Sequence, residues 1–169
     1  MNDQQIIIFE GLDMSGKTTI LNALSGVLNI PAYKEIRQEK WYDHVIDLLY
    51  AEEARLQLIE QIGFSIIFDR SYPSEFVYAH SYGRQTIDDK IWEFDERYAK
   101  LGAKIIICSK DSSKFQDDKT ALIDRDKYTT IASNYYVFSR MTKCKVLQLD
   151  TSSENLEWEI NKILEFIKE

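Results

Sequence analysis

The chain has 169 residues, of which 44% are apolar and 29% are charged, the composition of a globular protein that can bury a sizeable core. A total of 21 basic residues against 28 acidic ones gives a net charge of −7, which argues against broad, nonspecific binding of nucleic acid or of anionic membrane surfaces. No repeat, low-complexity tract or linker divides the sequence, so we expect one domain over residues 1–169.

The sequence gives no sign of a membrane or of an oxidising compartment. No apolar stretch is long enough to cross a bilayer, and the first apolar segment is a short strand and not a secretory leader. Cys108 and Cys144 lack the spacing of a metal site or a disulfide framework, so we expect both as reduced thiols. These features predict a cytoplasmic protein with no membrane partner.

The first predicted element is a buried strand, because residues 5–9 form an apolar run. Residues 11–18 follow with the spacing G-x-x-x-x-G-K-[ST]. The apolar residues from Ile20 to Leu28, Val27 among them, are then spaced like one face of a helix. The order of strand, glycine loop and helix is the setting in which this motif binds phosphate, so we expect a nucleoside triphosphate site here.

The residues of this loop have separate tasks in binding ATP. Gly11 and Gly16 permit backbone angles at which consecutive N–H groups turn toward an anion. Lys17 is expected to reach the β and γ phosphates, and the Thr18 hydroxyl is expected to bind Mg²⁺. The rest of the predicted ATP site comes from the same stretch: Met14, Ser15 and Thr19.

A second motif follows the third predicted strand. The pattern predicts a short strand at residues 32–36, one or two helices within residues 41–62 and a buried strand at residues 64–68 that ends at Asp69 and Arg70. A carboxylate at a strand end can order Mg²⁺ and its waters, whereas a guanidinium has the forked donors that suit a phosphate. We therefore expect Asp69 at a metal and Arg70 at a substrate phosphate; the alternative is a surface ion pair.

Three further positions are candidates for binding a second substrate. An acid inside a glycine loop repels polyphosphate unless it faces a cation or a substrate hydroxyl, so we favour a role for Asp13 on the acceptor. Arg37 follows the second strand and is a candidate for the acceptor phosphate, with an exposed surface arginine as the alternative. Tyr50 and Tyr78 are candidates for stacking on a nucleobase, although aromatic residues at helical spacing are more often part of a core.

The second half of the chain predicts more alternating helices and strands, with one polar interruption. Residues 111–127 are rich in charge and are predicted to form a mobile lid over phosphate, with Arg125 as the preferred cation; solvated surface is the alternative. The other predicted elements are a helix from Thr86 to Leu101 with a capping box of Thr86 and Asp89, a strand at 104–108, a helix at 128–141, a strand at 145–149 and a terminal helix capped by residues 151–154.

Strands that alternate with helices imply an α/β fold with a mostly parallel sheet covered on both faces. In such sheets, ligands bind beyond the carboxyl ends of the strands. The glycine loop, Arg37 and the pair Asp69-Arg70 all follow predicted strands, so we expect them to converge at that edge.

Two stretches carry a resemblance to a known family. Residues 9–19, FEGLDMSGKTT, and Asp69-Arg70 with Ser74 and Tyr78 at the offsets of a D-R-Y-x-x-S-x-x-x-Y element, resemble thymidylate kinase and its nucleoside monophosphate kinase relatives. The resemblance implies a three-layer P-loop kinase sandwich with a five-stranded sheet and a short lid at about 111–127. It also implies transfer of the ATP γ-phosphate to a deoxynucleoside 5′-monophosphate, with Mg²⁺ as cofactor.

By this resemblance the acceptor is a pyrimidine nucleotide: dTMP, dUMP or a modified analogue. Asp13 would face its sugar or phosphate, Arg70 and Arg37 its phosphate, and Ser74 and Tyr78 its base. Arg125, in a weaker match before the tyrosine-bearing helix, would bind the transferring phosphoryl group.

The sequence also departs from the family. The family's Arg-Glu-Pro-Gly-Gly turn appears as residues 37–40 without proline or glycine, and the stretch around Tyr50 that resembles the thymine-binding element is offset by one residue. These departures leave the base open.

Other functions stay open at this point. Glu35, Glu39-Lys40-Trp41 and Asp69-Arg70-Ser71 resemble the deoxynucleoside kinases, in which a carboxylate after the second strand takes the proton of the 5′-hydroxyl. A kinase acting on a modified base in DNA and a non-catalytic nucleotide-dependent switch protein are two more alternatives. The sequence does not decide between a monomer and a homodimer.

Overall fold

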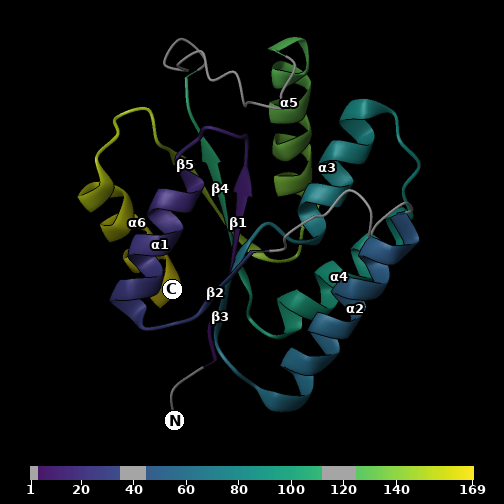
Figure 1. The fold of residues 1–169 in the computed structure, drawn as a ribbon, viewed down its shortest axis with the longest axis horizontal. Helices are drawn as coiled ribbons and strands as arrows, with labels where there is room; N and C mark the ends of the chain where they lie inside the picture. The colour runs from purple at the N-terminus through teal and green to yellow at the C-terminus, as the bar shows by residue number, and fades with distance from the viewer. Residues whose placement is uncertain (1–3, 35–44, 112–124) are drawn as a thin grey trace.

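The computed structural model describes residues 4–34, 45–111 and 125–169, which form five strands and six helices (Figure 1). In chain order these are β1 (Ile6–Gly11), α1 (Lys17–Leu28), β2 (Ala32–Lys34), α2 (Val45–Ile62), β3 (Ile66–Asp69), α3 (Tyr72–Tyr82), α4 (Asp88–Lys100), β4 (Lys104–Ser109), α5 (Arg125–Met141), β5 (Lys145–Asp150) and α6 (Leu156–Lys168).

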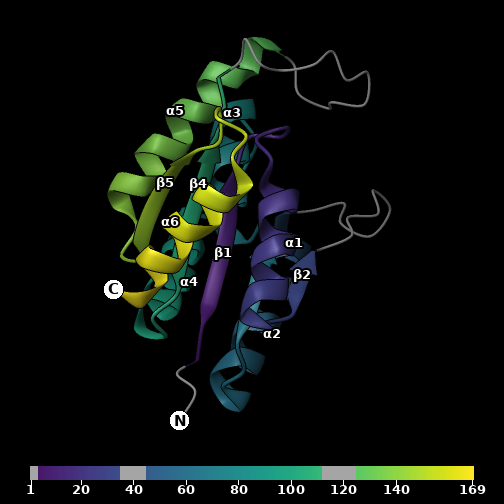
Figure 2. The same cartoon turned by 90° about the vertical axis from the view of Figure 1, so that its left-hand side faces the viewer.

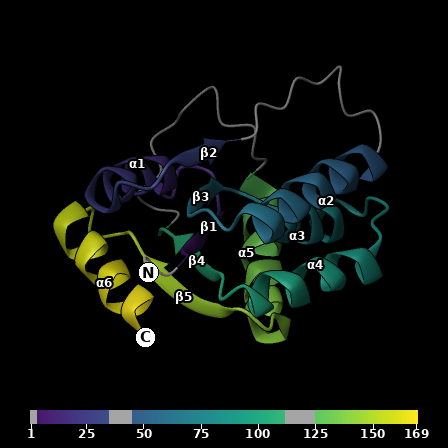
Figure 3. The ribbon, with the colours of Figure 1, turned by 90° about the horizontal axis from the view of Figure 1, so that it is seen from below.

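The five strands form one parallel sheet in the order β2-β3-β1-β4-β5. Helices α1 and α6 cover one face, and α2 to α5 cover the other, so the fold has three layers (Figures 1 and 3). Figure 2 shows α1 and α6 in front of the sheet. The predicted α/β fold class is confirmed.

The alternation of side chains along β1 decides which layer each residue meets. Ile6 and Ile8 pack in the core under α2 to α5, whereas Ile7 and Phe9 pack under α1 and α6. Successive side chains of an extended strand point to opposite faces, so the next residue, Glu10, faces the α3 and α5 side. The sheet therefore carries a buried acid toward these two helices at the edge where the glycine loop begins.

Several predicted helix features are wrong in detail. Helix α4 begins at Asp88, with Ile87 at the N-cap and no side-chain cap, so the predicted capping box does not form; two acids in the first turn favour this helix end instead. Helix α6 is capped by Asn155, which accepts a hydrogen bond from the Trp158 N–H at 3.1 Å, and not by residues 151–154. The hydroxyl of Thr151 is used elsewhere, because it donates to carbonyl oxygens in the glycine loop and at the end of β4.

Other predicted boundaries shift. Val27 is exposed, so the buried face of α1 is narrower than predicted. Helix α5 begins at Arg125, three residues earlier than the predicted start at 128, so Arg125 belongs to a helix and not to a loop. Helix α3 was not predicted at all. The rest of the predicted lid, residues 112–124, lies outside the described residues.

Cys108 and Cys144 are both buried, free thiols, as predicted. Within the described ranges, no helix is both long and apolar enough to cross a bilayer.

Helices α2 and α4 are joined by an arginine of α4 that contacts two acids of α2. Arg97 donates to both carboxylate oxygens of Glu60, at 2.9 and 2.7 Å, and to Glu53 at 2.8 Å. The hydrogen bonds from Arg97 hold the pKa of Glu60 below its usual value of 4.5. An acid whose pKa is lower in the folded state than in the unfolded state stabilises the fold at pH values above the unfolded pKa. This contribution is lost as the pH falls through the folded pKa.

We expect Arg97→Met to lower the free energy of unfolding by about 1 kcal/mol at neutral pH, as is typical of a partly exposed ion-pair network. At a pH of about 3 the difference should be smaller, because this pH lies below the usual carboxyl pKa and the charge contribution falls as the pH drops toward the lowered pKa values of the folded state. Urea denaturation at the two pH values measures it. An equal loss at both would mean that Arg97 acts through packing and not through charge.

Candidate active site

The glycine loop joins the carboxyl end of β1 to α1, as predicted. Gly11 has φ 122°, and a Cβ atom there would lie 2.0 Å from the carbonyl oxygen of Cys108 on β4. Gly16 has φ 78° and is the N-cap of α1, and Met14 between them has φ 63°. The loop thus turns the amino end of α1, with its unpaired N–H groups, toward the edge where an anion would bind.

Gly11→Ala is expected to destabilise the protein by about 3 kcal/mol or more, because the new methyl group collides with backbone and the φ angle is unfavourable for alanine. The matched control is Gly26→Ala in α1, where a Cβ atom meets nothing within 4 Å. That substitution should stabilise the helix by about 0.5–1 kcal/mol. Urea denaturation compares the two; a Gly11→Ala protein as stable as the wild type would contradict the close approach of β4.

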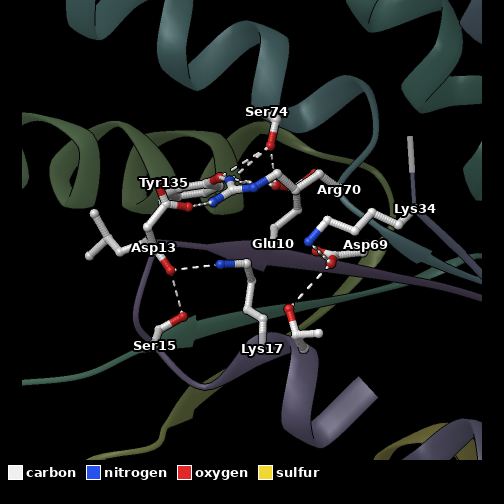
Figure 4. Close-up of polar contacts among 11 residues, drawn as sticks. Glu10, Asp13, Ser15, Lys17, Lys34, Asp69, Arg70, Ser74 and Tyr135 are labelled. Carbon is white, nitrogen blue, oxygen red and sulfur yellow. Dashed lines mark hydrogen bonds and ion pairs between the residues drawn. The ribbon is translucent and has the colours of Figure 1, made fainter. Parts of the chain in front are cut away.

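Lys17 is the first residue of α1 and is buried beneath the loop. Its Nζ donates to the Leu12 carbonyl oxygen at 2.7 Å, and the Ser15 hydroxyl donates to the same oxygen at 2.7 Å (Figure 4). Burial lowers the pKa of Lys17 to about 8, and repulsion from Arg70 adds to this effect. A buried ammonium of this kind gains strongly from an anion placed beside it, so the position favours phosphate.

Thr18 and Asp69, the two predicted metal residues, lie together. The Thr18 hydroxyl donates to Asp69 Oδ2 at 3.4 Å, and Lys34 Nζ lies 3.1 Å from the same oxygen. One hydroxyl and one carboxylate are the oxygen ligands that suit Mg²⁺, which keeps several waters and takes few protein ligands beside phosphate. Among the described residues no cluster of three or more His, Cys, Asp or Glu could hold a metal by itself. The residues present fit Mg²⁺ held jointly with a nucleotide.

Arg70 is held in a fixed position beside the loop. Its backbone has φ 73°, in the left-handed region, and its N–H donates to the Phe9 carbonyl oxygen at 2.9 Å. Its guanidinium donates to Tyr135 OH at 2.9 Å, to Ser74 Oγ at 3.2 Å and to Asp13 Oδ1 at 2.5 Å (Figure 4). A strained backbone supported by so many bonds is typical of a functional position.

Glu10 is a site residue that sequence reasoning missed. It is completely buried at the end of β1, and its carboxylate accepts hydrogen bonds from Ser74 Oγ at 2.6 Å, Tyr135 OH at 2.9 Å and the Ser71 N–H at 2.9 Å. Arg70 Nη1 lies 3.9 Å from it. Burial raises the pKa of Glu10, and the charge of Arg70 opposes that rise. The signal in the sequence was an acid that follows Ile6 and Ile8 at alternating positions, which places it on the same buried face of the strand.

A cavity of about 330 Å³ opens beside these residues. The loop and the strand ends contribute Asp13, Lys34, Asp69 and Arg70 to its wall. Helices α2 and α3, with the link between β3 and α3, contribute the rest: Leu48, Leu49, Glu52, Arg55, Ser71, Tyr72 and Glu75. The cavity therefore begins at the glycine loop and continues between α2 and α3, where a second substrate would lie.

The other predicted residues differ in where they lie. Ser74 is buried behind Arg70, and the Tyr78 ring lies 5.2 Å from the Arg70 guanidinium, so both contact this arginine. Tyr50 is 71% exposed on α2 and lines a different hollow with Ile87 and Lys90, so the structure does not bring it to the site. Arg37 lies outside the described residues, and Arg125 is placed only as the first residue of α5.

The parallel order β2-β3-β1-β4-β5, with a glycine loop between β1 and α1, is the fold of the P-loop kinases. Solved structures with this fold include the YorR protein of Bacillus subtilis in complex with phosphorylated GDP, which is 19% identical over 96% of this chain and 95% of that chain, with a TM-score of 0.76. Deoxyadenosine kinase from M. mycoides with bound dATP is 18% identical over 98% of this chain and 100% of that chain, with a TM-score of 0.65.

Thymidylate kinase from Ehrlichia chaffeensis is 15% identical over 97% of this chain and 99% of that chain, with a TM-score of 0.62. No protein-family model matches the sequence, and no curated protein matches it. At these identities the likeness establishes the fold.

Proposed function

We propose that the chain is an ATP-dependent kinase of deoxynucleoside 5′-monophosphates, with a pyrimidine nucleotide (dTMP, dUMP or a modified analogue) as acceptor. The observation that carries the proposal is the position of Arg70. Its guanidinium is fixed from behind by Ser74 and Tyr135 and lines the same cavity as the loop residue Asp13. A guanidinium fork suits a phosphate, so the acceptor phosphate would dock beside the transferring one.

The proposed mechanism uses position and charge, with no covalent intermediate. Lys17 and the N–H groups of the loop bind the ATP phosphates, and Arg70 binds the acceptor phosphate in line with the γ-phosphate. Thr18 and Asp69 would hold Mg²⁺, which neutralises phosphate charge when bound. The acceptor oxygen of a monophosphate is already ionised, so the reaction needs no strong general base.

The second candidate is a deoxynucleoside kinase. The fold likeness to deoxyadenosine kinase, with a TM-score of 0.65, is similar to that to thymidylate kinase, with a TM-score of 0.62. A nucleoside acceptor has a neutral 5′-hydroxyl and needs a carboxylate base, and the cavity wall has four acids: Asp13, Glu52, Asp69 and Glu75. Three of them form ion pairs with a cation of the same wall, Asp13 with Arg70, Asp69 with Lys34 and Glu52 with Arg55. We favour a phosphorylated acceptor because Arg70 and Lys34 lie next to the loop, where an acceptor phosphate would dock.

Thermal denaturation with a panel of ligands separates these functions. In the presence of Mg²⁺, we expect deoxynucleoside 5′-monophosphates to raise the melting temperature and the matching nucleosides to have little effect, because only the former place a phosphate at Arg70. Stabilisation by nucleosides alone would favour the nucleoside kinase. Stabilisation by ATP and by no acceptor would favour a nucleotide-dependent switch protein.

A further inference from the structure

Lys34, the last residue of β2, shares a carboxylate oxygen with a residue of the ATP site. Its Nζ lies 3.1 Å from Asp69 Oδ2, the oxygen that also accepts the Thr18 hydrogen bond. The parallel register pairs Lys34 directly with Asp69, so the two side chains leave neighbouring strands at the same level. Figure 4 shows the lysine reaching across to the acid.

The two partners of this ion pair have opposite surroundings. The Lys34 side chain is 65% exposed, whereas the Asp69 side chain is only 5% exposed. A pair with one partner so exposed contributes little to folding stability. The lysine stem is long and flexible, so its ammonium can move to a new anion without a change in the backbone.

Lys34 also lines the cavity that begins at the glycine loop, as does Arg70. These two cations thus border the position where a substrate phosphate would dock, in a wall that also has Arg55 and four acids: Asp13, Glu52, Asp69 and Glu75. A divalent cation bound to Thr18 and Asp69 would compete with the Lys34 ammonium for Asp69 Oδ2. The charge of the cation would also repel the ammonium. An acceptor phosphate bound in the same cavity would then offer the freed ammonium a new anionic partner.

We propose that Lys34 binds the phosphate of the acceptor nucleotide, and that it exchanges Asp69 for this phosphate when a divalent cation binds at Thr18 and Asp69. The proposal rests on the proposed monophosphate kinase function and adds to it. It assigns a second cation to the acceptor site. It also makes metal binding and acceptor binding mutually favourable. The bound cation frees Lys34 for the acceptor phosphate, and the bound phosphate draws Lys34 away from Asp69, which the cation needs.

Lys34→Met removes the ammonium and keeps the stem. We expect the acceptor KM to rise about 10- to 100-fold, the range for one lost hydrogen bond to a charged group, while the ATP KM changes less than about 2-fold. Lys34→Arg keeps the charge and should hold the acceptor KM within about 5-fold of the wild type. The exposed position of Lys34 means that both variants should fold, which far-UV circular dichroism checks.

A direct metal titration gives a readout that needs no turnover. Mn²⁺ alone is titrated into the protein, and free Mn²⁺ is followed by electron paramagnetic resonance. Lys34→Met should bind Mn²⁺ about 2- to 5-fold more tightly than the wild type, because the competing ammonium is gone. An unchanged or weaker Mn²⁺ affinity would mean that the ammonium does not compete with the cation for Asp69.

The matched control is Lys100→Met, which removes a similarly exposed lysine from an ion pair with Glu96 on α4. It makes the same change in net charge and should alter neither constant. An acceptor KM or an Mn²⁺ affinity of Lys34→Met equal to that of the control overturns the assignment and leaves the kinase function intact. A wild-type enzyme that phosphorylates no monophosphate refutes the proposed function, and with it the acceptor role of Lys34.

Discussion

Lys17→Met is expected to lower kcat about 10²- to 10³-fold, the usual effect of removing one fixed donor that stabilises transition-state charge. The ammonium lies beneath the glycine loop, 2.7 Å from the Leu12 carbonyl oxygen, where it would meet the β and γ phosphates. Methionine fills the same volume without the charge. The rate in a coupled assay at saturating ATP measures the loss.

The fold should tolerate this substitution. Burial lowers the pKa of Lys17 to about 8, which means that burying its charge costs folding free energy. A neutral side chain at this position avoids that cost. The Leu12 carbonyl oxygen keeps its hydrogen bond from the Ser15 hydroxyl. We therefore expect a melting temperature close to that of the wild type.

Lys104→Met is the matched control for Lys17→Met. Lys104 begins β4, at the opposite end of the sheet from the loop, and its Nζ also donates to a backbone carbonyl, that of Ile167, at 2.5 Å. Its loss should leave kcat unchanged. Full activity of Lys17→Met would contradict the phosphate site itself.

Arg70→Met is expected to affect both activity and stability. The acceptor kcat/KM should fall about 10²-fold or more, because the fork that binds the acceptor phosphate is gone. The free energy of unfolding should fall by about 2–3 kcal/mol, because the buried Glu10 carboxylate, 3.9 Å from Arg70 Nη1, loses its compensating charge. Steady-state kinetics and urea denaturation measure the two effects.

A second substitution separates these two effects of Arg70. Adding Glu10→Gln to Arg70→Met removes the uncompensated acid, so the double variant should regain stability relative to Arg70→Met. Activity should stay low, since no guanidinium returns. Recovery of activity together with stability would mean that Arg70 acts only as a support for Glu10.

The glycine loop could be predicted because its signal is local. Strand, loop and helix are consecutive, and Gly11, Gly16, Lys17 and Thr18 need only their own sequence neighbours to form the site. The acid Asp13 was harder to interpret. A cation or a substrate hydroxyl was required near it, and the structure supplies the cation as Arg70, 57 positions along the chain. Only the pairing of β1 with β3 brings them together.

The residues that hold Arg70 in place could not be predicted either, because they are far apart in the sequence. Glu10 and Tyr135 are 125 positions apart, and their hydrogen bond exists because α5 packs on the face of β1 that Glu10 shares with Ile6 and Ile8. The periodicity of a single sequence shows which face of a strand or helix is buried, but not which residues that face contacts. A buried acid could be noticed, but its contacts could not.

Helix α3 escaped prediction because it has almost no solvent face. Its residues from Tyr72 to Val77 are all buried, since the helix packs against α4, α5 and β1. A helix enclosed in this way lacks the alternation of apolar and polar residues that marks a surface helix. Proline and serine in its first turn occur in turns as well as at helix starts, so they do not mark a helix when the sequence is considered alone.

The central claim is that the chain transfers phosphate from ATP to a phosphorylated acceptor held by Arg70. The most direct measurement offers radiolabelled γ-phosphate ATP with Mg²⁺ to matched pairs of deoxynucleosides and their 5′-monophosphates, with duplex DNA containing a modified pyrimidine as a third acceptor. We predict labelled deoxynucleoside diphosphate from at least one pyrimidine monophosphate, and no product from its nucleoside or from DNA. Label appearing only in a nucleoside monophosphate, only in DNA, or in no acceptor would contradict it.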